Sequence, residues 1–563
     1  MNARLSSVSL ALAGSGGAGV MTAGNILLEA AAAAGYYGLM TRTSGPQIRG
    51  GEAAAMLRIS TFATDGQDDR FEILAAIDWQ NVQRFAAELP LGSSSLILGD
   101  PTQGEPPEVF TKSGARYLPL PLKALAAQVA GGWPNMVALG ALAGLIGLPP
   151  EAIDAAVRKS MKKGIDGALA AARLGAQQIL AIKDFELEET TKRAGRWLIT
   201  GNEAAGYGAL RGGVRFVAAY PITPATELLE WLSPALPKVG GTLVQAEDEL
   251  ASINMILGAS YGGVPSLTAT SGPGLSLMIE ALGLGVTAEV PIVVVDVMRT
   301  GPSTGIATKS EQADLNIALY GLHGDAPHIV VAPNSVSDCV AATEWAVGLA
   351  ESLQVPAIVL SDQYFGQARA VIDLPALQKE KPERLTAKGN GNPYKRYTLT
   401  ASGVSPMAVP GTPGTTYTAD GLEHNERGLP SSQAGDHLAQ MDKRARKIAL
   451  LDPGEAWASV EGEGDTAVVT FGSCTGPARE ALAREGCRAR LISLRMLAPA
   501  QPGRLKKALE GVKRVVVVEQ NHSGQFLRYL RSEYELPADV RSLRRPGPLP
   551  FRPDEIYREV MKP

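Results

Sequence analysis

The chain has 563 residues, more than one hydrophobic core usually organises, so about three domains are expected. Its 53 Lys and Arg residues nearly balance 57 Asp and Glu residues, and no long basic run is present that would neutralise a nucleic-acid backbone. Nucleic acid is therefore not an expected partner. Aromatic residues make up only 5% of the chain while Ala and Gly are abundant, which favours helices packed on parallel sheets over an all-β architecture.

The three cysteines, Cys339, Cys474 and Cys487, lie far apart and lack the Cys-x-x-Cys spacing of zinc and iron–sulfur sites. Any metal cluster is expected to come from another chain. The stretch 1–9 has no apolar run of signal-peptide type, and no stretch of about 18 uninterrupted apolar residues follows it. These features predict a cytoplasmic protein that does not associate with a membrane.

The first α/β domain is predicted at residues 1–182. An apolar run, a glycine-rich turn and an alanine-rich stretch open it and predict a strand, a turn and a helix at 8–13, 14–19 and 22–34. Further strand-like and helical runs alternate as far as the end of this region. The charged stretch 183–196 that follows is predicted to be a solvated linker.

The turn Gly14-x-Gly16-x-x-Gly19 matches the dinucleotide fingerprint, in which glycines let a pyrophosphate approach a helix N-terminus. The acidic residue that would hold a ribose about 20 positions further on is replaced by the segment Thr41-Arg42-Thr43. Three interpretations stay open: a nicotinamide nucleotide site, a purely structural turn, and a site for another phosphate such as that of coenzyme A. We favour the last.

A second glycine-rich loop, 43–51, lies between two predicted strands and carries a single cation, Arg49. One interpretation is a solvent-facing hairpin. The other is a loop that offers hydroxyls, amides and the Arg49 guanidinium to an anionic ligand.

The central domain is predicted at 197–383, where strand-like and helical runs alternate as in a parallel sheet. Ligands of such sheets bind beyond the carboxyl ends of the strands. Residues 384–446 are rich in Gly, Pro, Thr and Ser and are predicted to be an ordered covering segment rather than a disordered one, because they include three tyrosines and His424. Residues 447–563 are predicted to form a third, smaller α/β domain.

Four polar segments of the central domain come in an order that suits successive strand ends of one sheet: Tyr-Pro-Ile-Thr-Pro at 220–224, Glu-Asp-Glu at 247–249, Thr-Ser-Gly-Pro-Gly at 270–274 and Met-Arg-Thr at 298–300. Prolines in the first segment fix φ and present the Thr223 hydroxyl at a defined place. Glu249 opens an apolar helical run, where a carboxylate either interacts with the helix dipole or points at a ligand. Arg299 is suited to clamp a carboxylate with its planar fork. Each residue alone has an ordinary structural explanation, but together they indicate a catalytic cleft.

These segments, with Val-Glu-Gln-Asn-x-Ser-Gly-Gln at 518–525, resemble the α subunit of 2-oxoacid:ferredoxin oxidoreductases of the 2-oxoglutarate type. The opening glycine-rich turn and the loop Ser-Gly-Pro-Gln-Ile-Arg-Gly-Gly at 44–51 resemble the γ domain of the same family, fused ahead of the α part. The resemblance implies three α/β domains: a γ domain, a domain that binds the pyrimidine of thiamine diphosphate, and a domain like the C-terminal domain of transketolase.

By the same resemblance, Glu249 hydrogen-bonds the aminopyrimidine ring of thiamine diphosphate and so activates the thiazolium carbon, with Glu247 as the rival candidate. Thr223 and Arg299 are implied to hold the carboxylate and the 2-oxo group of the substrate, and Ser44 and Arg49 to contact its distal end or coenzyme A. The residues implied to line the cofactor site are Tyr220, Pro221, Ile222, Glu249, Ser271 and Gly272.

The sequence lacks a Gly-Asp-Gly segment that would bind magnesium and the cofactor's diphosphate. The resemblance assigns Mg²⁺, the diphosphate site and a [4Fe–4S] cluster to a β subunit, and implies an α₂β₂ assembly that passes electrons to a ferredoxin. The implied reaction, which belongs to the tricarboxylic acid cycle, converts 2-oxoglutarate and coenzyme A to succinyl-CoA and CO₂, or runs in reverse. Two alternatives remain: pyruvate or another 2-oxoacid as substrate, and a non-catalytic scaffold subunit.

Overall fold

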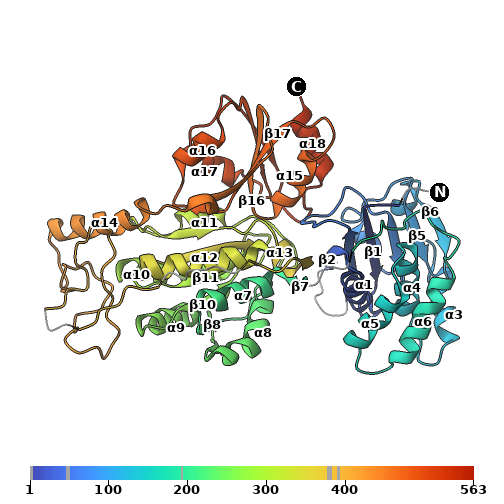
Figure 1. Ribbon diagram of the computed structural model, residues 1–563, viewed down its shortest axis with the longest axis horizontal. Helices are drawn as coiled ribbons and strands as arrows, with labels where there is room; N and C mark the ends of the chain where they lie inside the picture. The colour runs from blue at the N-terminus through green and yellow to red at the C-terminus, as the bar shows by residue number, and fades with distance from the viewer. Residues whose placement is uncertain (1–3, 46–50, 192–194, 377–382, 390–392) are drawn as a thin grey trace. The chain divides into compact units, whose positions relative to one another are not determined.

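The computed structural model describes residues 4–45, 51–191, 195–376, 383–389 and 393–563. The chain divides into two compact units. The first comprises Met1–Thr200, Gln367–Leu374 and Phe551–Glu555, and the second comprises Gly201–Gly366, Pro375–Pro550 and Ile556–Pro563. One sheet lies in the first unit and two lie in the second (Figure 1). The predicted α/β class is confirmed.

The sheet of the first unit has eight strands, and their order across it is β6-β5-β4-β1-β3-β2-β14-β7. Strands β1, β4, β5 and β6 are parallel, while β3, β2, β14 and β7 pair antiparallel. The strands are β1 (Ser7–Gly14), β2 (Tyr37–Ser44), β3 (Ala53–Ser60), β4 (Ile73–Ala76), β5 (Leu96–Gly99), β6 (Arg116–Pro119), β7 (Trp197–Thr200) and β14 (Arg369–Ile372).

Small residues let the helices of this unit approach one another closely. A Cβ on Gly140 of α4 would lie 1.7 Å from the Ala172 carbonyl oxygen of α6, and one on Gly175 would lie 2.0 Å from that of Val137. No side chain fits at either position, which explains why this region is so rich in Gly and Ala. The helices are α1 (Val20–Ala34), α2 (Glu108–Thr111), α3 (Leu122–Ala127), α4 (Pro134–Leu145), α5 (Pro150–Ser160) and α6 (Ile165–Gln177).

Strands β7 and β14 belong to a different sheet from the one expected from the sequence. Sequence analysis places residues 197–200 and 369–372 in the central domain, whereas the structure adds both strands to the first sheet, β14 between β2 and β7. The physical reason is that β2 would otherwise end the sheet with unpaired backbone groups. Short apolar strands from outside the first 182 residues supply the missing hydrogen bonds.

The central sheet of the second unit has seven strands in the order β18-β12-β13-β11-β10-β8-β9, parallel except for β18. Its strands are β8 (Phe216–Ala219), β9 (Thr242–Gln245), β10 (Ser266–Thr270), β11 (Val293–Met298), β12 (Ile329–Val331), β13 (Ala357–Asp362) and β18 (Met496–Ala498). The helices of this region are α7 (Gly201–Gly212), α8 (Thr226–Ala235), α9 (Glu249–Tyr261), α10 (Gly272–Thr287), α11 (Leu315–Tyr320), α12 (Asp338–Leu353) and α13 (Gln363–Gln367).

The third sheet has the order β15-β17-β16-β19-β20, in which only β15 is antiparallel to its neighbour. Its strands are β15 (Ala458–Glu461), β16 (Thr466–Phe471), β17 (Ala489–Leu494), β19 (Arg514–Glu519) and β20 (Asp539–Arg544). The later helices are α14 (Ala434–Ala449), α15 (Thr475–Leu482), α16 (Pro502–Ala508), α17 (Gln525–Glu533) and α18 (Pro553–Met561). Of the helices that the structure describes, none has the length and apolar composition needed to span a bilayer.

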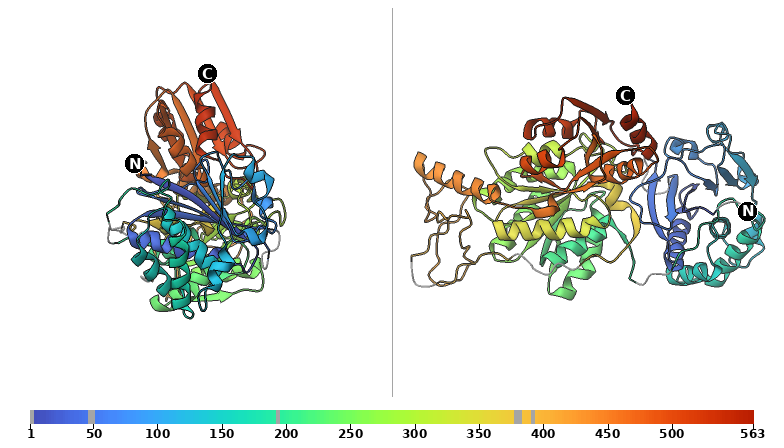
Figure 2. Two further views of the ribbon diagram at one scale, coloured as in Figure 1. Left: turned by 90° about the vertical axis from the view of Figure 1, so that its right-hand side faces the viewer. Right: turned by 45° about the horizontal axis from the view of Figure 1, so that its top comes forward.

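The described part of the covering segment, residues 384–446, is irregular chain as far as α14, and both are drawn in brown and orange in Figures 1 and 2. Its described part has a core of its own, in which the Tyr397 ring lies 3.5 Å from the His424 ring and 6.1 Å from that of Tyr417, centroid to centroid. The fully buried Glu289 accepts hydrogen bonds from Lys443 and Lys447 of α14. These contacts fix the segment to the C-terminal end of α10.

Candidate active site

The strand order of the central sheet creates a crevice between β8 and β10. The chain runs from β8 outward to β9 and then crosses back to β10 on the other side of β8. Helices therefore leave these two adjacent strands in opposite directions, which opens a gap at their carboxyl ends. The segment 220–224 follows β8 and the segment 270–274 ends β10, so sequence-predicted polar segments lie on both sides of this point.

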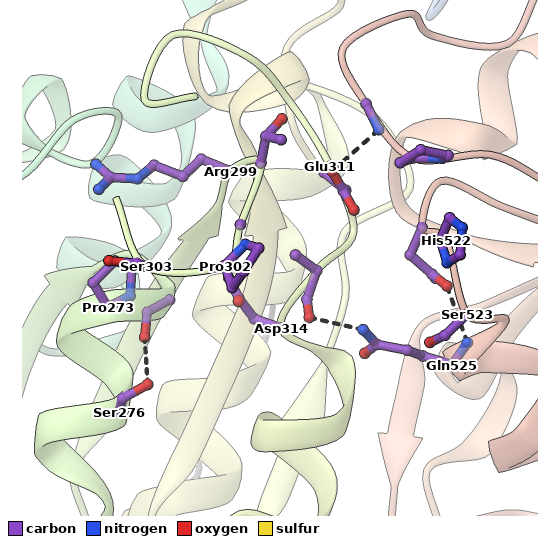
Figure 3. Close-up of a pocket in the computed structure, with 17 residues that line it drawn as sticks. Pro273, Ser276, Arg299, Pro302, Ser303, Glu311, Asp314, His522, Ser523 and Gln525 are labelled. Atoms are coloured by element: carbon purple, nitrogen blue, oxygen red, sulfur yellow. Dashed lines mark hydrogen bonds between the residues drawn. The ribbon is translucent and has the colours of Figure 1, made fainter. Parts of the chain in front are cut away.

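A cavity of about 690 Å³ opens where strand ends of the central and third sheets meet. One wall follows β10 and β11 and includes Gly272, Arg299 and Asp314. The other follows β19 and β20 and includes Asn521, His522 and Ser523. In Figure 3 the guanidinium of Arg299 points away from His522 and Ser523. The pocket therefore combines the Arg299 side chain and the carboxyl groups of Glu311 and Asp314 with the polar groups of the other wall.

Arg299 joins two of the predicted segments. Its Nη1 donates a hydrogen bond of 2.6 Å to the Thr223 carbonyl oxygen, and its Nε is buried without a partner among the described residues. The side chain of Asn202 donates to the Pro224 carbonyl oxygen at 2.9 Å and holds the same turn from behind. Burial lowers the pKa of Arg299, while the Asp314 carboxyl opposes that shift. A buried guanidinium with an unused donor is a suitable partner for an anion.

Glu249 is buried at the first position of α9, with 8% of its surface exposed, whereas Glu247 is exposed. The helix is capped by Asp248, whose carboxylate accepts the Ala251 N–H at 2.7 Å, so Glu249 is not needed as the cap. No residue in the described part of the chain donates a hydrogen bond to the Glu249 carboxylate. The side chain packs on Gly274, where an added Cβ would lie 2.8 Å from Glu249 Oε1.

Ser271 and Gly272 start α10 at the end of β10. The Ser271 Oγ is buried and has no partner among the described residues, although this residue occupies the N-cap position. A Cβ on Gly272 would lie 2.4 Å from Asp314 Oδ1, so a larger residue there would displace the Asp314 carboxyl group. Tyr220, Pro221 and Ile222 form the turn that leads from β8 to Thr223, and 40% of the Tyr220 surface is exposed.

Three carboxyl groups at this site were not predicted from the sequence: Asp296, Glu311 and Asp314. Asp296 is fully buried in β11, and both of its oxygens lack a hydrogen-bond partner in the described chain. Burial raises the pKa of Glu311 and raises that of Asp314 to about 7. The sequence does contain a signal for Asp296, because it is a charged residue inside the otherwise apolar strand Val-Val-Val-Asp-Val-Met.

The predicted residues of the first domain lie in the other unit. Ser44 ends β2 and pairs with Ala53, whereas Arg49 lies outside the described residues. At the glycine-rich turn, the Ser15 N–H and hydroxyl both donate to Asp78. A Cβ on Gly19 would lie 2.3 Å from Asn135 Nδ2. These contacts fit the structural interpretation of the turn, because a carboxylate already takes the first donors of the loop.

The late segment 519–525 has two roles. Glu519 accepts the N–H groups of Phe526 and Leu527 at the start of α17, and the Gln520 N–H donates to Gln312 Oε1 at 2.8 Å. The contacts of Glu519 hold α17 to β19, whereas the contact of Gln520 joins the third sheet to the central region. Asn521, His522 and Ser523 line the pocket instead.

Two family models match the chain. Residues 207–443 match the thiamine diphosphate-binding domain of pyruvate flavodoxin/ferredoxin oxidoreductase, and residues 9–178 match a pyruvate ferredoxin/flavodoxin oxidoreductase domain. The first model therefore covers Thr223, Glu249 and Arg299, and the second covers the glycine-rich turn at 14–19.

Characterised relatives match over almost the whole chain. The α subunit of a 2-oxoacid:ferredoxin oxidoreductase from Saccharolobus solfataricus is 32% identical, with 92% of each chain covered. The 2-oxoglutarate oxidoreductase subunit KorA of Mycobacterium tuberculosis is 31% identical, with 99% of this chain and 91% of the relative covered. A solved structure, the 2-oxoglutarate:ferredoxin oxidoreductase of Magnetococcus marinus with 2-oxoglutarate, coenzyme A and succinyl-CoA bound, is 35% identical, covers 99% of both chains and superimposes with a TM-score of 0.91.

Proposed function

Because the chain belongs to the family of 2-oxoacid:ferredoxin oxidoreductase α subunits, we propose that it supplies half of a thiamine diphosphate pocket in an enzyme that oxidises 2-oxoglutarate. The proposed reaction consumes 2-oxoglutarate and coenzyme A, releases CO₂ and succinyl-CoA, and passes the electrons to a ferredoxin. With a low-potential donor it would run in reverse and fix CO₂. We place it in the tricarboxylic acid cycle of the cytoplasm.

The observation that carries the proposal is the carboxylate of Glu249, which belongs to a residue only 8% exposed and accepts no hydrogen bond from the described residues. Polar groups with so little contact with water usually have a hydrogen-bond partner in native folds, so this carboxylate is expected to meet a ligand. An aminopyrimidine ring offers a ring nitrogen that a carboxyl group can protonate or hydrogen-bond. The exposed Glu247 has no comparable need for a partner.

The other groups at the crevice fit the same cofactor. The buried Ser271 Oγ has an unused hydroxyl, and Gly272 and Gly274 keep the floor free of side chains where a Cβ would collide with Asp314, Thr270 or Glu249. Tyr220, Pro221 and Ile222 would line the edge of the ring site. When bound, thiamine diphosphate supplies a nucleophilic carbon that attacks the 2-oxo group and accepts the electron pair left by CO₂.

This chain's own residues would then bind, orient and exchange protons. Glu249 would hold a proton at the pyrimidine ring nitrogen, within a site that burial keeps from bulk water. Arg299 would bind the carboxylate of the 2-oxoacid through the donors that Thr223 leaves unused. The Thr223 hydroxyl would orient the 2-oxo group. Holding the acid in one orientation is what makes loss of CO₂ the preferred outcome.

We infer that the remaining parts come from a β subunit in an α₂β₂ assembly. The three cysteines of this chain cannot ligate a [4Fe–4S] cluster together, because they are far apart in sequence and Cys339 and Cys474 are buried in different sheets' cores. The cluster, Mg²⁺ and the diphosphate site are therefore assigned to β. Ser44 and Arg49 of the first domain are proposed to contact coenzyme A or the distal end of the acid.

One alternative substrate has specific support. The relative from Saccharolobus solfataricus is named for 2-oxoacids in general, so pyruvate or another 2-oxoacid remains a second candidate. The test is co-expression with the β subunit and assay of viologen reduction with coenzyme A and a panel of 2-oxoacids. The proposal requires the highest kcat/KM for 2-oxoglutarate, and a higher value for pyruvate would replace it with the alternative.

Two substitutions test the residue assignments. Glu249→Gln should abolish turnover and weaken thiamine diphosphate binding in calorimetry, while the matched variant Glu247→Gln should keep both. Arg299→Ala should lower kcat/KM for the 2-oxoacid about 10- to 100-fold, the equivalent of one charge-assisted hydrogen bond of roughly 1.5–3 kcal/mol. Full turnover in Glu249→Gln would refute the role of that residue and remove the main support for the proposed function.

A further inference from the structure

Asn202 anchors the turn at 220–224, which carries Thr223. This residue is the second of α7, and only 1% of its surface is exposed. Its side-chain amide donates a hydrogen bond of 2.9 Å to the Pro224 carbonyl oxygen. The preceding carbonyl group, that of Thr223, accepts the 2.6 Å hydrogen bond from Arg299 Nη1. Two consecutive carbonyl groups of the turn are therefore held by two different side chains.

The Asn202 side chain also packs where α13 approaches β11. A Cβ on Gly366 of α13 would lie 3.0 Å from Asn202 Oδ1 and 2.9 Å from Val297 Cγ1. Val297 is fully buried in β11, two residues before Arg299. The glycine therefore lets the Asn202 amide and the end of β11 approach the same stretch of backbone.

The backbone at the start of α7 is itself fixed by a close contact. A Cβ on Gly201 would lie 2.3 Å from the Phe365 carbonyl oxygen and 2.7 Å from the carbonyl carbon. Both of these atoms belong to the backbone, so no side chain fits at Gly201. The neighbouring Asn202 has a short side chain with few rotamers. Its amide is therefore held in one place, from which it reaches the Pro224 carbonyl group.

The turn requires a hydrogen-bond donor at this place and not only a side chain of this size. A carbonyl oxygen accepts hydrogen bonds, so it is satisfied by an amide and repelled by an ionised carboxylate of the same shape. An apolar side chain would remove the hydrogen bond and leave the buried acceptor without this donor. The contact can therefore be tested with isosteric substitutions.

We propose that Asn202 is a positioning residue, which fixes the turn so that the Thr223 hydroxyl and the Arg299 guanidinium hold the 2-oxoacid in one orientation. This inference rests on the proposed function, which assigns the substrate to Thr223 and Arg299. Asn202 acts only through the turn and does not touch the substrate.

Three substitutions change the contact in different ways. Asn202→Leu keeps the size and removes the donor, so kcat/KM for the 2-oxoacid should fall about 10- to 100-fold at every pH, as for a misplacement of up to about 1 Å. Gly366→Ala keeps the donor but displaces the amide, so it should cause a similar loss. In Asn202→Asp, burial favours the protonated carboxyl group, whose O–H can donate to Pro224. This variant should approach native kcat/KM at pH 6 and lose it as the group ionises towards pH 9.

The experiment measures kcat/KM of the assembled enzyme for the 2-oxoacid and for coenzyme A from pH 6 to 9. It also measures hydrogen exchange of the full chain in peptides that span 220–229. Asn202→Leu should exchange faster in these peptides and keep native kcat/KM for coenzyme A, because only the turn that holds the acid is released. A merely structural role predicts similar losses for both substrates. Gly366→Ala serves if Asn202→Leu does not fold.

Asn334→Leu is the matched control. Asn334 is also buried, and its amide donates to the carbonyl oxygens of Ser493 and Leu494 at 3.2 and 3.3 Å. This variant should lose stability as Asn202→Leu does, but it should keep native kinetics for both substrates and native exchange in the turn.

The outcomes separate this inference from the proposed function. Native kcat/KM for the 2-oxoacid in Asn202→Leu, with a loss in Arg299→Ala, overturns the positioning role. Equal losses in Asn202→Asp at pH 6 and pH 9 overturn the role of the donor. If Arg299→Ala keeps native kinetics, the substrate role of Arg299 fails, and exchange in the turn still decides whether Asn202 anchors it. Native exchange in Asn202→Leu overturns that anchoring.

Discussion

Replacing Gly274 with alanine should impair catalysis without removing any functional group. An ideal Cβ at this position would lie 2.0 Å from Thr270 Oγ1 and 2.8 Å from both Cγ and Oε1 of Glu249. Carbon and oxygen atoms in contact are about 3.3 Å apart. The Thr270 hydroxyl would therefore have to retreat by about 1.3 Å and the Glu249 carboxylate by about 0.5 Å.

Thr270 should resist this adjustment, so the first turn of α10, which carries the new Cβ, and the Glu249 carboxylate should shift instead. Thr270 is fully buried in β10, between two hydrogen-bonded strands, and its β-branched side chain has few rotamers. Glu249 has more rotatable bonds and no hydrogen bond to a described residue that would hold its carboxylate in place. A displacement near 1 Å at a reacting group costs about 100-fold in rate. We therefore expect kcat/KM to fall by roughly that factor in Gly274→Ala.

The assay is viologen reduction by the assembled enzyme with 2-oxoglutarate, coenzyme A, Mg²⁺ and thiamine diphosphate, with cofactor affinity measured by calorimetry. Gly435→Ala is the matched control, because a Cβ at Gly435 in the first turn of α14 meets no atom within 4 Å. That variant should keep native kinetics. Native kcat and native cofactor affinity in Gly274→Ala would show that the position of Glu249 does not matter, and the reasoning about this carboxylate would be wrong.

Two further predictions concern stability. Glu289→Gln should lower the free energy of unfolding by about 3–5 kcal/mol in chemical denaturation, because it leaves the buried Lys443 and Lys447 without their carboxylate; a loss no larger than that of the more exposed Glu423→Gln would contradict this. Burial raises the pKa of Glu72 from 4.5 to about 7, so the folded chain binds that proton more tightly than the unfolded chain. The contribution of Glu72 to the free energy of unfolding should therefore be largest below pH 4.5 and should decline as the pH rises to about 7. Glu72→Gln should remove this part of the decline, and an identical pH profile in the variant would refute the assignment.

Much of the fold was predictable because buried parallel strands are short apolar runs. The predicted strand at 8–13 corresponds to β1 within one residue at each end, and the predicted helix at 22–34 corresponds to α1 within two. Strands β7, β14 and β18 were missed for a physical reason: each is three or four residues long and pairs with a strand distant in sequence. Nothing in a local pattern identifies such a partner.

The candidate site was predictable in part for a related reason. Glu249, Ser271 and Arg299 follow strand ends, and the carboxyl ends of adjacent parallel strands meet at one edge. Asp314 lies before a short helix in a loop and comes near Arg299 only through the path of that loop. Asp296 was visible as a charge in an apolar strand, but the burial of both its oxygens without a donor among the described residues was not. Pairwise contacts between loops depend on tertiary structure, which periodicity does not encode.

The groups that the fold leaves unpartnered match the chemistry of the proposed ligands. Arg299 Nε is a donor suited to a carboxylate, the Glu249 carboxylate is an acceptor suited to an aminopyrimidine, and the Ser271 hydroxyl serves either role. Leaving the buried Arg299 Nε and Ser271 Oγ unpaired costs about 1–3 kcal/mol each, so the fold forgoes stability at this crevice. Beside them, Leu250 of α9 and Leu277 of α10 expose about half of their surfaces. Apolar side chains exposed next to a polar crevice suit coverage by another protein chain. Under the proposed function, the surface that would bind the ring would then also bind the proposed β subunit.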